Sequence, residues 1–192
     1  MNIKHFSHPF YHTIIYNFFE KHEISKIVNE ISNYDEIEPH QNDNHHSNLY
    51  KFNNTISFCV DDLFANNREN SSLLRSLNKV NDLNLAQFTN KNPFFGYFPF
   101  TTTDVTFVQK YKNESFYPSH TDGNAILTFL CPLYLQEFNE GKLNFISHNY
   151  HPPLEHNSLL IFPSYEIHEL SQIESNCDGY VRYSINRRYF ML

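Results

Sequence analysis

The chain contains 192 residues and carries a formal net charge of -7 at pH 7. This length suits one domain with a hydrophobic core of useful size and leaves little room for a second domain. Hydrophobic residues make up 40% of the chain, which excludes an intrinsically disordered protein, and the negative charge argues against a broad surface for binding nucleic acid.

The N-terminal segment is aromatic, but His, Asn and Lys residues interrupt it, so it lacks the continuous apolar core of a signal peptide. No stretch of the sequence approaches the length of a membrane span. The cysteines Cys59, Cys131 and Cys177 are widely spaced and form no CxxC pair, which argues against a zinc knuckle or a disulfide framework. We therefore expect a soluble cytoplasmic protein that does not bind membranes.

Two helices are expected in the first hundred residues. Apolar residues recur at helical spacing over Tyr16–Ile31 and again over Ser71–Leu83. The polar segment Asn33–Asn54 between them is typical of a loop. It contains three clustered histidines, His40, His45 and His46. Such a cluster can bind a metal, but a polar surface loop is its commoner origin, so we assign no site there. A helical layer is expected over about residues 1–101.

From residue 102 onward, short runs rich in β-branched and aromatic residues are typical of strands. Turn signals such as Asp122-Gly123 and Pro152-Pro153 separate these runs. The predicted strands are Asp104–Tyr111, Ala125–Leu135, Lys142–Ser147, Ser158–Phe162 and Tyr180–Phe190. Their spacing predicts a mainly β fold, either a sandwich or a barrel. We expect one domain over residues 1–192, with this β core over about residues 102–192.

A His-Thr-Asp motif provides the first candidate site. His120 and Asp122 lie two residues apart, so at an extended strand end their side chains point to the same side. His168 can supply a third ligand from a distant strand. Two imidazoles and one carboxylate on one face of an octahedral metal leave three positions open, as in non-haem iron(II) oxygenases. The sequence therefore predicts a metal site, and a catalytic centre, at these three residues.

Arg182 lies downstream in a run that otherwise resembles a core strand. A 2-oxo diacid that binds a metal through its keto-acid end projects its other carboxylate into the protein. A strand-borne arginine can bind that carboxylate through a forked pair of charge-assisted hydrogen bonds. A surface charge on an edge strand is the alternative, but the combination with the His-Thr-Asp motif favours an anion site.

About residues 104–190 resemble the prolyl-hydroxylase branch of the 2-oxoglutarate/iron(II) oxygenases, which includes the oxygen-sensing prolyl hydroxylases and their bacterial relatives. The resemblance lies in the runs FYPSHTD, EGKLNF, SLLIFPSYEIHEL and RYSINRRYF. It implies a double-stranded β-helix, or jelly roll, whose sheets enclose the metal and which N-terminal α-helices support. It also implies Fe(II) as the metal, with 2-oxoglutarate and dioxygen as co-substrates.

Residue roles are implied by position in these motifs. The resemblance implies that His120, Asp122 and His168 bind iron. It implies that Arg182 binds the far carboxylate of 2-oxoglutarate. The spacing from the distal histidine to this arginine is longer than is usual in the family, and we expect a longer hairpin with a turn at Asp178-Gly179 to accommodate it.

Three tyrosines match further positions of the family. The resemblance implies that Tyr111 and Tyr134 line the co-substrate pocket and that Tyr117 lies near the substrate entrance. Aromatic packing is the alternative for all three in a chain with 13 tyrosines.

The implied reaction couples decarboxylation of 2-oxoglutarate to hydroxylation of a C–H bond. Asp122 favours hydroxylation, because halogenating relatives carry a small residue at this position. The resemblance favours a prolyl residue in a protein or peptide as the substrate, with free proline or another small molecule also open.

Two other functions are weighed. A nucleic-acid demethylase of the same superfamily carries two arginines six residues apart on its final strand, and Arg182 and Arg188 fit this spacing. The net charge argues against it, so a nucleic-acid partner is not expected. A non-enzymatic, cupin-like metal-binding jelly roll usually takes ligands from an HxH pattern, and the chain contains no such pattern.

Overall fold

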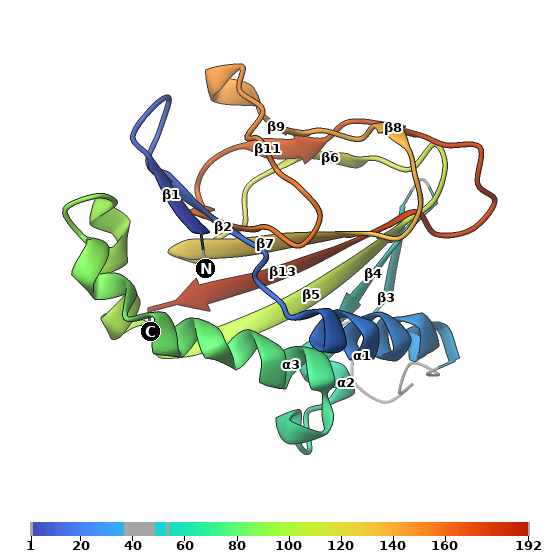
Figure 1. Cartoon of the computed structure of the whole chain (residues 1–192), viewed down its shortest axis with the longest axis horizontal. Helices are drawn as coiled ribbons and strands as arrows, with labels where there is room; N and C mark the ends of the chain where they lie inside the picture. The colour runs from blue at the N-terminus through green and yellow to red at the C-terminus, as the bar shows by residue number, and fades with distance from the viewer. Residues whose placement is uncertain (1, 37–48, 53, 192) are drawn as a thin grey trace.

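The computed structural model describes residues 2–36, 49–52 and 54–191. Two antiparallel β-sheets face each other, and helices cover the outer face of the larger sheet (Figure 1). The mainly β architecture with supporting helices that the sequence predicts is confirmed. The clustered histidines His40, His45 and His46 lie outside the described residues.

The larger sheet contains eight antiparallel strands in the described part of the chain. Their order is β1 (Asn2–Phe6), β2 (His12–Tyr16), β10 (Leu159–Pro163), β7 (Leu127–Tyr134), β13 (Arg182–Phe190), β5 (Thr103–Tyr111), β4 (Thr55–Cys59) and β3 (Leu49–Phe52). The facing sheet consists of β6 (Tyr117–His120), β11 (His168–Leu170) and β9 (Leu143–Phe145). A two-stranded ribbon pairs β12 (Ile173–Glu174) with β8 (Asn139–Glu140).

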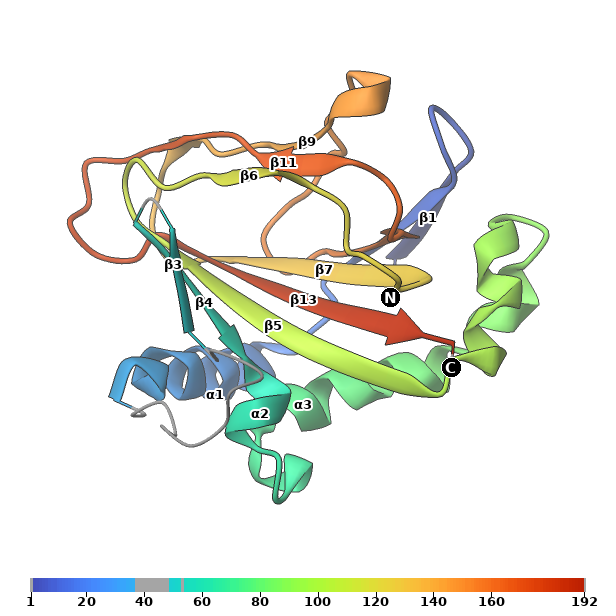
Figure 2. The ribbon, with the colours of Figure 1, turned by 180° about the vertical axis from the view of Figure 1, so that it is seen from behind.

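The N-terminal region contains strands as well as the helices that the sequence predicts. Strands β1 to β4 lie in it and extend the large sheet at both edges, with β3 and β4 beside β5 when the molecule is seen from behind (Figure 2). The segment predicted as a loop over Asn33–Asn54 includes β3. Strand β2 is buried along its whole length, so it lacks the alternation of polar and apolar residues that identifies a half-exposed strand.

The connection from His168 to Arg182 is also different from the predicted hairpin. Strand β11 belongs to the small sheet and β13 to the large one, while β12 between them pairs with β8. The extra residues therefore carry the chain from one sheet to the other.

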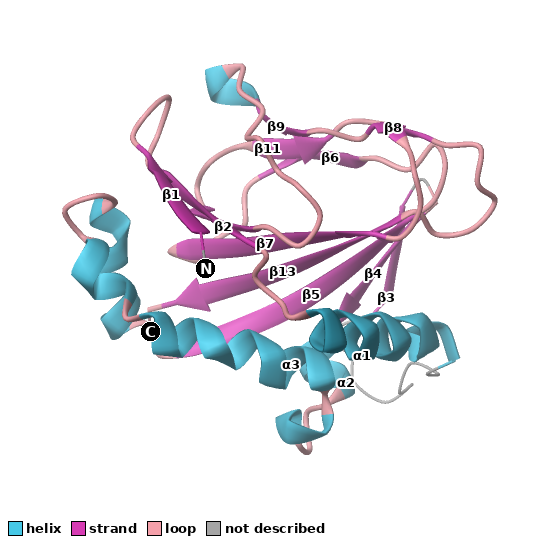
Figure 3. Ribbon diagram, in the orientation of Figure 1, coloured by secondary structure: helices cyan, strands magenta, loops and turns pink. Residues whose placement is uncertain are grey.

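The helices are shorter than predicted (Figure 3). Helix α1 spans Lys21–Ser32, because the chain before it forms β2, and the backbone N–H of Glu20 donates to Glu23 Oε2 at 2.7 Å at its start. Helix α3 covers Ser72–Leu77 and continues as a 3-10 turn, η3, over Asn78–Leu83. The other helical segments are α2 (Val60–Leu63), η1 (Asn33–Glu36), η2 (Arg68–Asn70), η4 (Leu85–Phe88), η5 (Pro93–Gly96), η6 (Phe98–Phe100) and η7 (Ile146–His148). Within the described ranges, no helix has both the length and the apolar character needed to cross a membrane.

Hydrophobic cores lie on both faces of the large sheet. On the helix side, Ile27 of α1 and Leu74 of α3 belong to the same buried cluster as Ile185 of β13. Between the sheets, Phe145 of β9 and Phe162 of β10 belong to a second buried cluster. The large sheet is therefore covered on both sides, and strands β2, β7 and β10 contribute buried side chains to both clusters.

Strand β13 lies between β5 and β7 and alternates its side chains between these two faces. Tyr183 and Ile185 pack in the helix-side core. Because side chains alternate along a strand, the other face carries Arg182, Ser184, Asn186 and Arg188.

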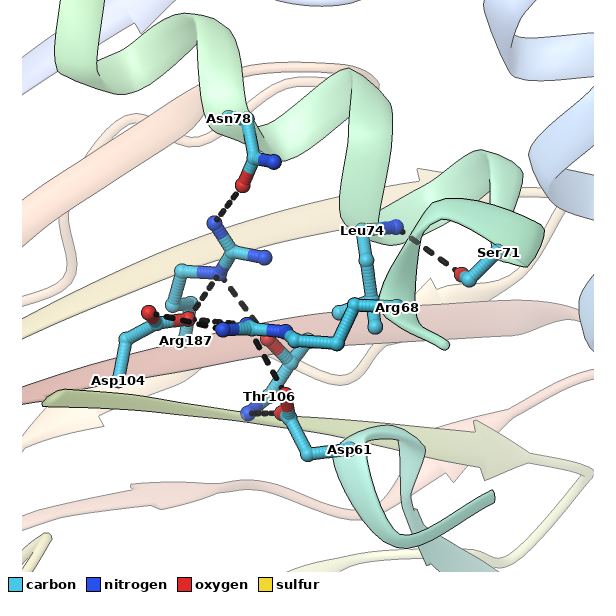
Figure 4. Close-up of polar contacts among 8 residues, drawn as sticks. All are labelled: Asp61, Arg68, Ser71, Leu74, Asn78, Asp104, Thr106 and Arg187. Atoms are coloured by element: carbon cyan, nitrogen blue, oxygen red, sulfur yellow. Dashed lines mark hydrogen bonds and ion pairs between the residues drawn. The ribbon is translucent and has the colours of Figure 1, made fainter. Parts of the chain in front are cut away.

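Arg187 anchors the helix side of β13 and is 1% exposed. Its Nε donates to Thr106 Oγ1 at 3.0 Å and lies 3.3 Å from Asp104 Oδ2 (Figure 4). Its Nη1 donates to Asn78 Oδ1 at 3.1 Å. Arg68 also pairs with Asp104, so this network ties the helical segments η2 and η3 to the sheet.

Candidate active site

Three candidate metal ligands meet between the two sheets. His120 ends β6, Asp122 follows it, and His168 begins β11. The pairing of β6 with β11 places the two histidines opposite each other, with ring centroids 4.3 Å apart. The ligand atoms of the three residues all lie within 4.8 Å of one another. The structure thus brings together the three residues that the His-Thr-Asp motif and the distal histidine suggested.

Each histidine is oriented through its Nδ1 atom. His120 Nδ1 lies 2.8 Å from the Pro118 carbonyl oxygen, and His168 Nδ1 lies 2.8 Å from the Glu166 carbonyl oxygen. A carbonyl oxygen only accepts hydrogen bonds, so Nδ1 is the protonated nitrogen in both rings. The lone pair of each neutral ring is therefore on Nε2, and each Nε2 lies 3.7 Å from a carboxylate oxygen of Asp122.

Asp122 is held by contacts to three other strands or loops. Its side chain is 0% exposed, and its backbone N–H donates to the Ser164 carbonyl at 2.9 Å. Oδ2 accepts a hydrogen bond from Thr128 Oγ1 at 2.6 Å, and Oδ1 lies 2.6 Å from Arg188 Nη2. The carboxylate is therefore fixed in place, and one guanidinium balances its buried charge.

This donor set fits a divalent metal ion. Burial lowers the pKa of His168 to about 4, although the charge of Asp122 opposes the shift. The imidazole is therefore neutral near pH 7, which is the form that binds a metal. Two imidazoles and one carboxylate form the facial set that Fe(II) takes in non-haem oxygenases, and backbone carbonyls hold the second nitrogen of each ring.

A narrow cavity extends from the histidines along β13 to Arg182. His120 and His168 line it together with this arginine. The remaining wall residues are Gln109, Tyr111, Tyr117, Leu130, Leu143, Glu169, Leu170, Ser184 and Asn186. The two candidate histidine ligands and the arginine therefore face one common space.

Arg182 is a buried cation without an acidic partner among the described residues. It is 2% exposed, its Nη1 donates to the Gly141 carbonyl at 2.7 Å, and its Nε donates to Ser184 Oγ at 3.2 Å. Burial lowers its pKa, because the charged form loses hydration. A buried charge without a counter-ion is costly, so the site is suited to an anionic ligand.

The turn that presents the Gly141 carbonyl has an unusual backbone. Glu140 and Gly141 both have positive φ angles, of 55° and 65°. A Cβ atom at Gly141 would lie 2.7 Å from Ile173 Cγ1, so a side chain here would force the ribbon apart. The turn therefore requires glycine at the residue whose carbonyl holds Arg182.

The three candidate tyrosines all lie at the site. The ring centroids of Tyr111 and Tyr134 lie 5.9 and 5.7 Å from the Arg182 guanidinium carbon. Burial raises the pKa of both phenols, so their hydroxyls stay protonated and can donate hydrogen bonds. Tyr111 and Tyr117 line the cavity beside the histidines, whereas Tyr134 lines a wider open depression that also reaches Arg182. The Tyr117 ring lies 4.7 Å from the His120 ring.

Sequence reasoning missed three residues of the site and considered a fourth, Arg188, only for the nucleic-acid demethylase. Thr128, Ser164 and Arg188 hold Asp122, and Asn186 lines the cavity. A signal existed for two of them, because the alternation that places Arg182 on the cavity face also places Asn186 and Arg188 there. Thr128 and Ser164 reach the carboxylate through long-range strand pairing, for which the sequence offers no local signal.

No family model and no curated protein matches the chain. Solved structures match it over most of its length. A prolyl-4-hydroxylase from Pseudomonas putida is 17% identical with a TM-score of 0.63, and the match covers 94% of this chain and 92% of that one. A prolyl hydroxylase from Trichoplax adhaerens, in complex with a peptide fragment of hypoxia inducible factor, is 16% identical with a TM-score of 0.61, covering 94% and 83%.

A third match is a plant enzyme, the dioxygenase for auxin oxidation 1 from Arabidopsis thaliana in complex with 2-oxoglutarate. It is 15% identical with a TM-score of 0.62, covering 94% of this chain and 82% of that one. Identities this low mean that the likeness lies in the arrangement of the strands and helices rather than in the sequence. The chain therefore has the jelly-roll fold of the 2-oxoglutarate/Fe(II) oxygenases, as the sequence predicts.

Proposed function

We propose that this chain is a 2-oxoglutarate- and Fe(II)-dependent dioxygenase that hydroxylates a C–H bond. One observation carries the proposal: the two histidines of a His-Asp-His cluster line the same cavity as a buried arginine that lacks an acidic partner among the described residues. A 2-oxo diacid has the two ends that such a cavity needs, because its keto-acid end chelates a metal and its distal carboxylate pairs with a guanidinium. The shared fold with proteins solved in complex with 2-oxoglutarate supports this co-substrate.

In this proposal, His120, Asp122 and His168 bind Fe(II), which with 2-oxoglutarate and dioxygen supplies the oxidising chemistry. Arg182 binds the distal carboxylate of the co-substrate. Its guanidinium is already oriented by two hydrogen bonds, so little side-chain entropy is lost on binding. Tyr111 donates its phenolic proton to the same carboxylate.

Tyr134 packs beside Arg182 and shields the resulting ion pair from water. Asp122 is oriented before the metal binds, because Thr128 and Arg188 hold its two oxygens. Such prior ordering keeps the coordination geometry fixed during turnover.

We propose a prolyl ring, in a peptide or as free proline, as the substrate. Tyr117 lies beside His120, whose side chain is 26% exposed, on the accessible side of the metal cluster. A compact apolar ring can pack against this phenol and present one C–H bond to the metal. The prolyl hydroxylases of the same fold, one in complex with a peptide, support this substrate class.

A nucleic-acid demethylase is the second candidate. Arg188 lies on the cavity face of β13, six residues from Arg182, and contacts Asp122. This placement favours the two-arginine strand of that class. The net charge of -7 weighs against it.

The purified protein can be tested with Fe(II) and 2-oxoglutarate against a proline-containing peptide, free proline and a methylated oligonucleotide. We expect succinate together with one added oxygen atom on proline, and no turnover by His168→Ala. Formaldehyde released from the oligonucleotide would establish the second candidate instead. Absence of both succinate formation and metal-dependent 2-oxoglutarate binding in the wild-type protein would refute the oxygenase.

We further propose that residues 1–192 act as one domain in the cytoplasm. Ile27 and Ile185, from the two halves of the chain, belong to one buried core. Cys59, Cys131 and Cys177 are free thiols, which is typical of a reducing compartment.

A further inference from the structure

Asn186 is a buried polar side chain to which no described protein group offers a hydrogen bond. The residue is 4% exposed, and its Oδ1 is fully buried without a partner. Buried polar groups in folded proteins are nearly always paired, because an unpaired one loses its hydration without compensation. A buried asparagine whose side chain pairs with no protein group is therefore a candidate for binding a ligand.

A second asparagine of the same chain shows what a structural role looks like. Asn157 is also 4% exposed. Its Oδ1 accepts from the Phe19 N–H at 2.8 Å, and its Nδ2 donates to the Phe19 carbonyl at 2.8 Å. Both ends of that amide are used to fix a loop, whereas the amide of Asn186 holds no protein group in place.

The position of Asn186 identifies the part of the cavity that it serves. It lines the cavity together with His120 and His168. Along the cavity face of β13 it stands four residues from Arg182, a distance of about 13 Å. Arg188, which contacts the candidate ligand Asp122, is only two residues away. Asn186 therefore lies toward the metal cluster rather than toward the anion-binding arginine.

The strands beside β13 offer this amide no polar partner. Its neighbours in the sheet are Phe107 on β5 and Leu130 on β7. Both of these side chains are apolar, and Gln109, the next cavity-facing residue on β5, donates to Ser57 Oγ instead. The group that pairs with the amide must therefore come from within the cavity, and a 2-oxo acid held at the metal cluster would bring its proximal carboxylate there.

We infer that Asn186 binds the metal-side carboxylate of 2-oxoglutarate by donating its side-chain N–H to one of the carboxylate oxygens. A carboxylate only accepts hydrogen bonds, so the atom that binds it is the side-chain nitrogen, which makes no hydrogen bond to a described residue of the cavity wall. The two ends of the co-substrate are thus bound by different residues, the distal carboxylate by Arg182 and the proximal carboxylate by Asn186. This inference rests on the proposed function.

The test compares two ligands that differ in the proximal carboxylate. 2-Oxoglutarate carries it, whereas 4-oxopentanoate keeps the ketone and the distal carboxylate but lacks the proximal one. Dissociation constants are measured for the Mn(II)-loaded protein without oxygen, directly for 2-oxoglutarate and by competition for 4-oxopentanoate. Asn186→Leu removes the hydrogen bond at similar volume, and Asn186→Ala serves as a second variant.

We expect Asn186→Leu to weaken 2-oxoglutarate binding by about ten- to one-hundred-fold, the loss of a hydrogen bond to a charged group. Binding of 4-oxopentanoate and of Mn(II) should not change. The melting temperature should not fall, because no protein hydrogen bond is lost. Asn144→Leu is the control, since Asn144 Oδ1 is also buried without a partner but lies outside the cavity. This variant loses the hydrogen bond from Asn144 Nδ2 to Glu169 Oε1, and it should bind both ligands normally.

Equal 2-oxoglutarate affinity in the Asn186 variants and the wild type would overturn the inference and leave the proposed oxygenase standing. Equal weakening of both ligands would also overturn it, because the effect would then not depend on the proximal carboxylate. Wild-type protein that binds no 2-oxoglutarate in the presence of Mn(II) would refute the proposed function itself.

Discussion

Two buried arginines on β13, five residues apart, show how differently the two faces of one strand are used. Arg187 and Arg182 are 1% and 2% exposed, so both are buried cations. Arg187, on the helix side, lies 3.3 Å from Asp104 and donates to two neutral oxygens, although its Nη2 has no partner. Arg182, between the sheets, donates only to a backbone carbonyl and a serine hydroxyl in the described structure.

The comparison separates a structural charge from a binding charge. On the helix side the protein supplies the anion, so the guanidinium joins the helices to the sheet. Between the sheets the protein leaves both the cation of Arg182 and the amide of Asn186 without a matching group. Buried polar groups without a partner lower the stability of the fold, and they are retained where a ligand supplies the missing partner.

The largest effect is expected from Arg182→Met. It should weaken 2-oxoglutarate binding by about 2–5 kcal/mol, because the carboxylate is left unpaired in a buried site. Thermal stability should stay the same or rise, since an uncompensated buried cation is removed. Calorimetric titration of the Mn(II)-loaded variant and a melting curve give both quantities. A large fall in the melting temperature of Arg182→Met would contradict the proposed difference between Arg182 and Arg187.

Arg187→Met should have the opposite profile. We expect a loss of about 3 kcal/mol in the free energy of unfolding, because Asp104 loses one of its two cations and Thr106 and Asn78 lose a donor. A domain of this size should then melt about 6–12 °C lower. Its affinity for 2-oxoglutarate should equal that of the wild type, and weakened binding would contradict the division between the faces.

Arg188→Met tests a residue that faces the cavity but has an acidic partner. The metal-free protein should lose about 2 kcal/mol of stability, because the buried Asp122 carboxylate loses its cation while the arginine itself is 20% exposed. Mn(II) should recover much of this loss, since the metal replaces the missing charge. Melting curves with and without Mn(II) measure the recovery. In Arg187→Met the metal should stabilise no more than it does the wild type.

For a change of one pH unit, the effect expected from His168 is the smallest of the four. The pKa of His168 is lowered by burial from 6.5 to about 4, so between these values the unfolded chain binds a proton that the folded, metal-free protein does not. Its free energy of unfolding should therefore decrease as pH falls through this window, by at most about 1.4 kcal/mol per pH unit. Urea unfolding across the window should show a flatter profile for His168→Gln. Identical pH profiles of stability for His168→Gln and the wild type would show that His168 does not cause the pH dependence.

The sequence predicts the site better than the sheet that surrounds it. The His-Thr-Asp motif, the distal histidine and Arg182 are recognisable because each depends on residue type and local alternation. Strand β2 is not recognisable, because a strand buried on both faces lacks alternation. Strand β4 pairs with β5, which is distant in the sequence, and no local pattern reports such a partner. Thr128 and Ser164, which hold Asp122, were missed for the same reason.

The turn at Glu140-Gly141 has a consequence for co-substrate selection. Its carbonyl holds the Arg182 guanidinium, and the close approach of Ile173 allows only glycine at this point. The separation between the guanidinium and the metal ligands is therefore set by the backbone rather than by a flexible side chain. We therefore expect diacids one methylene shorter or longer than 2-oxoglutarate to bind more weakly. Lengthening this turn by one residue should therefore shift the preferred chain length of the diacid.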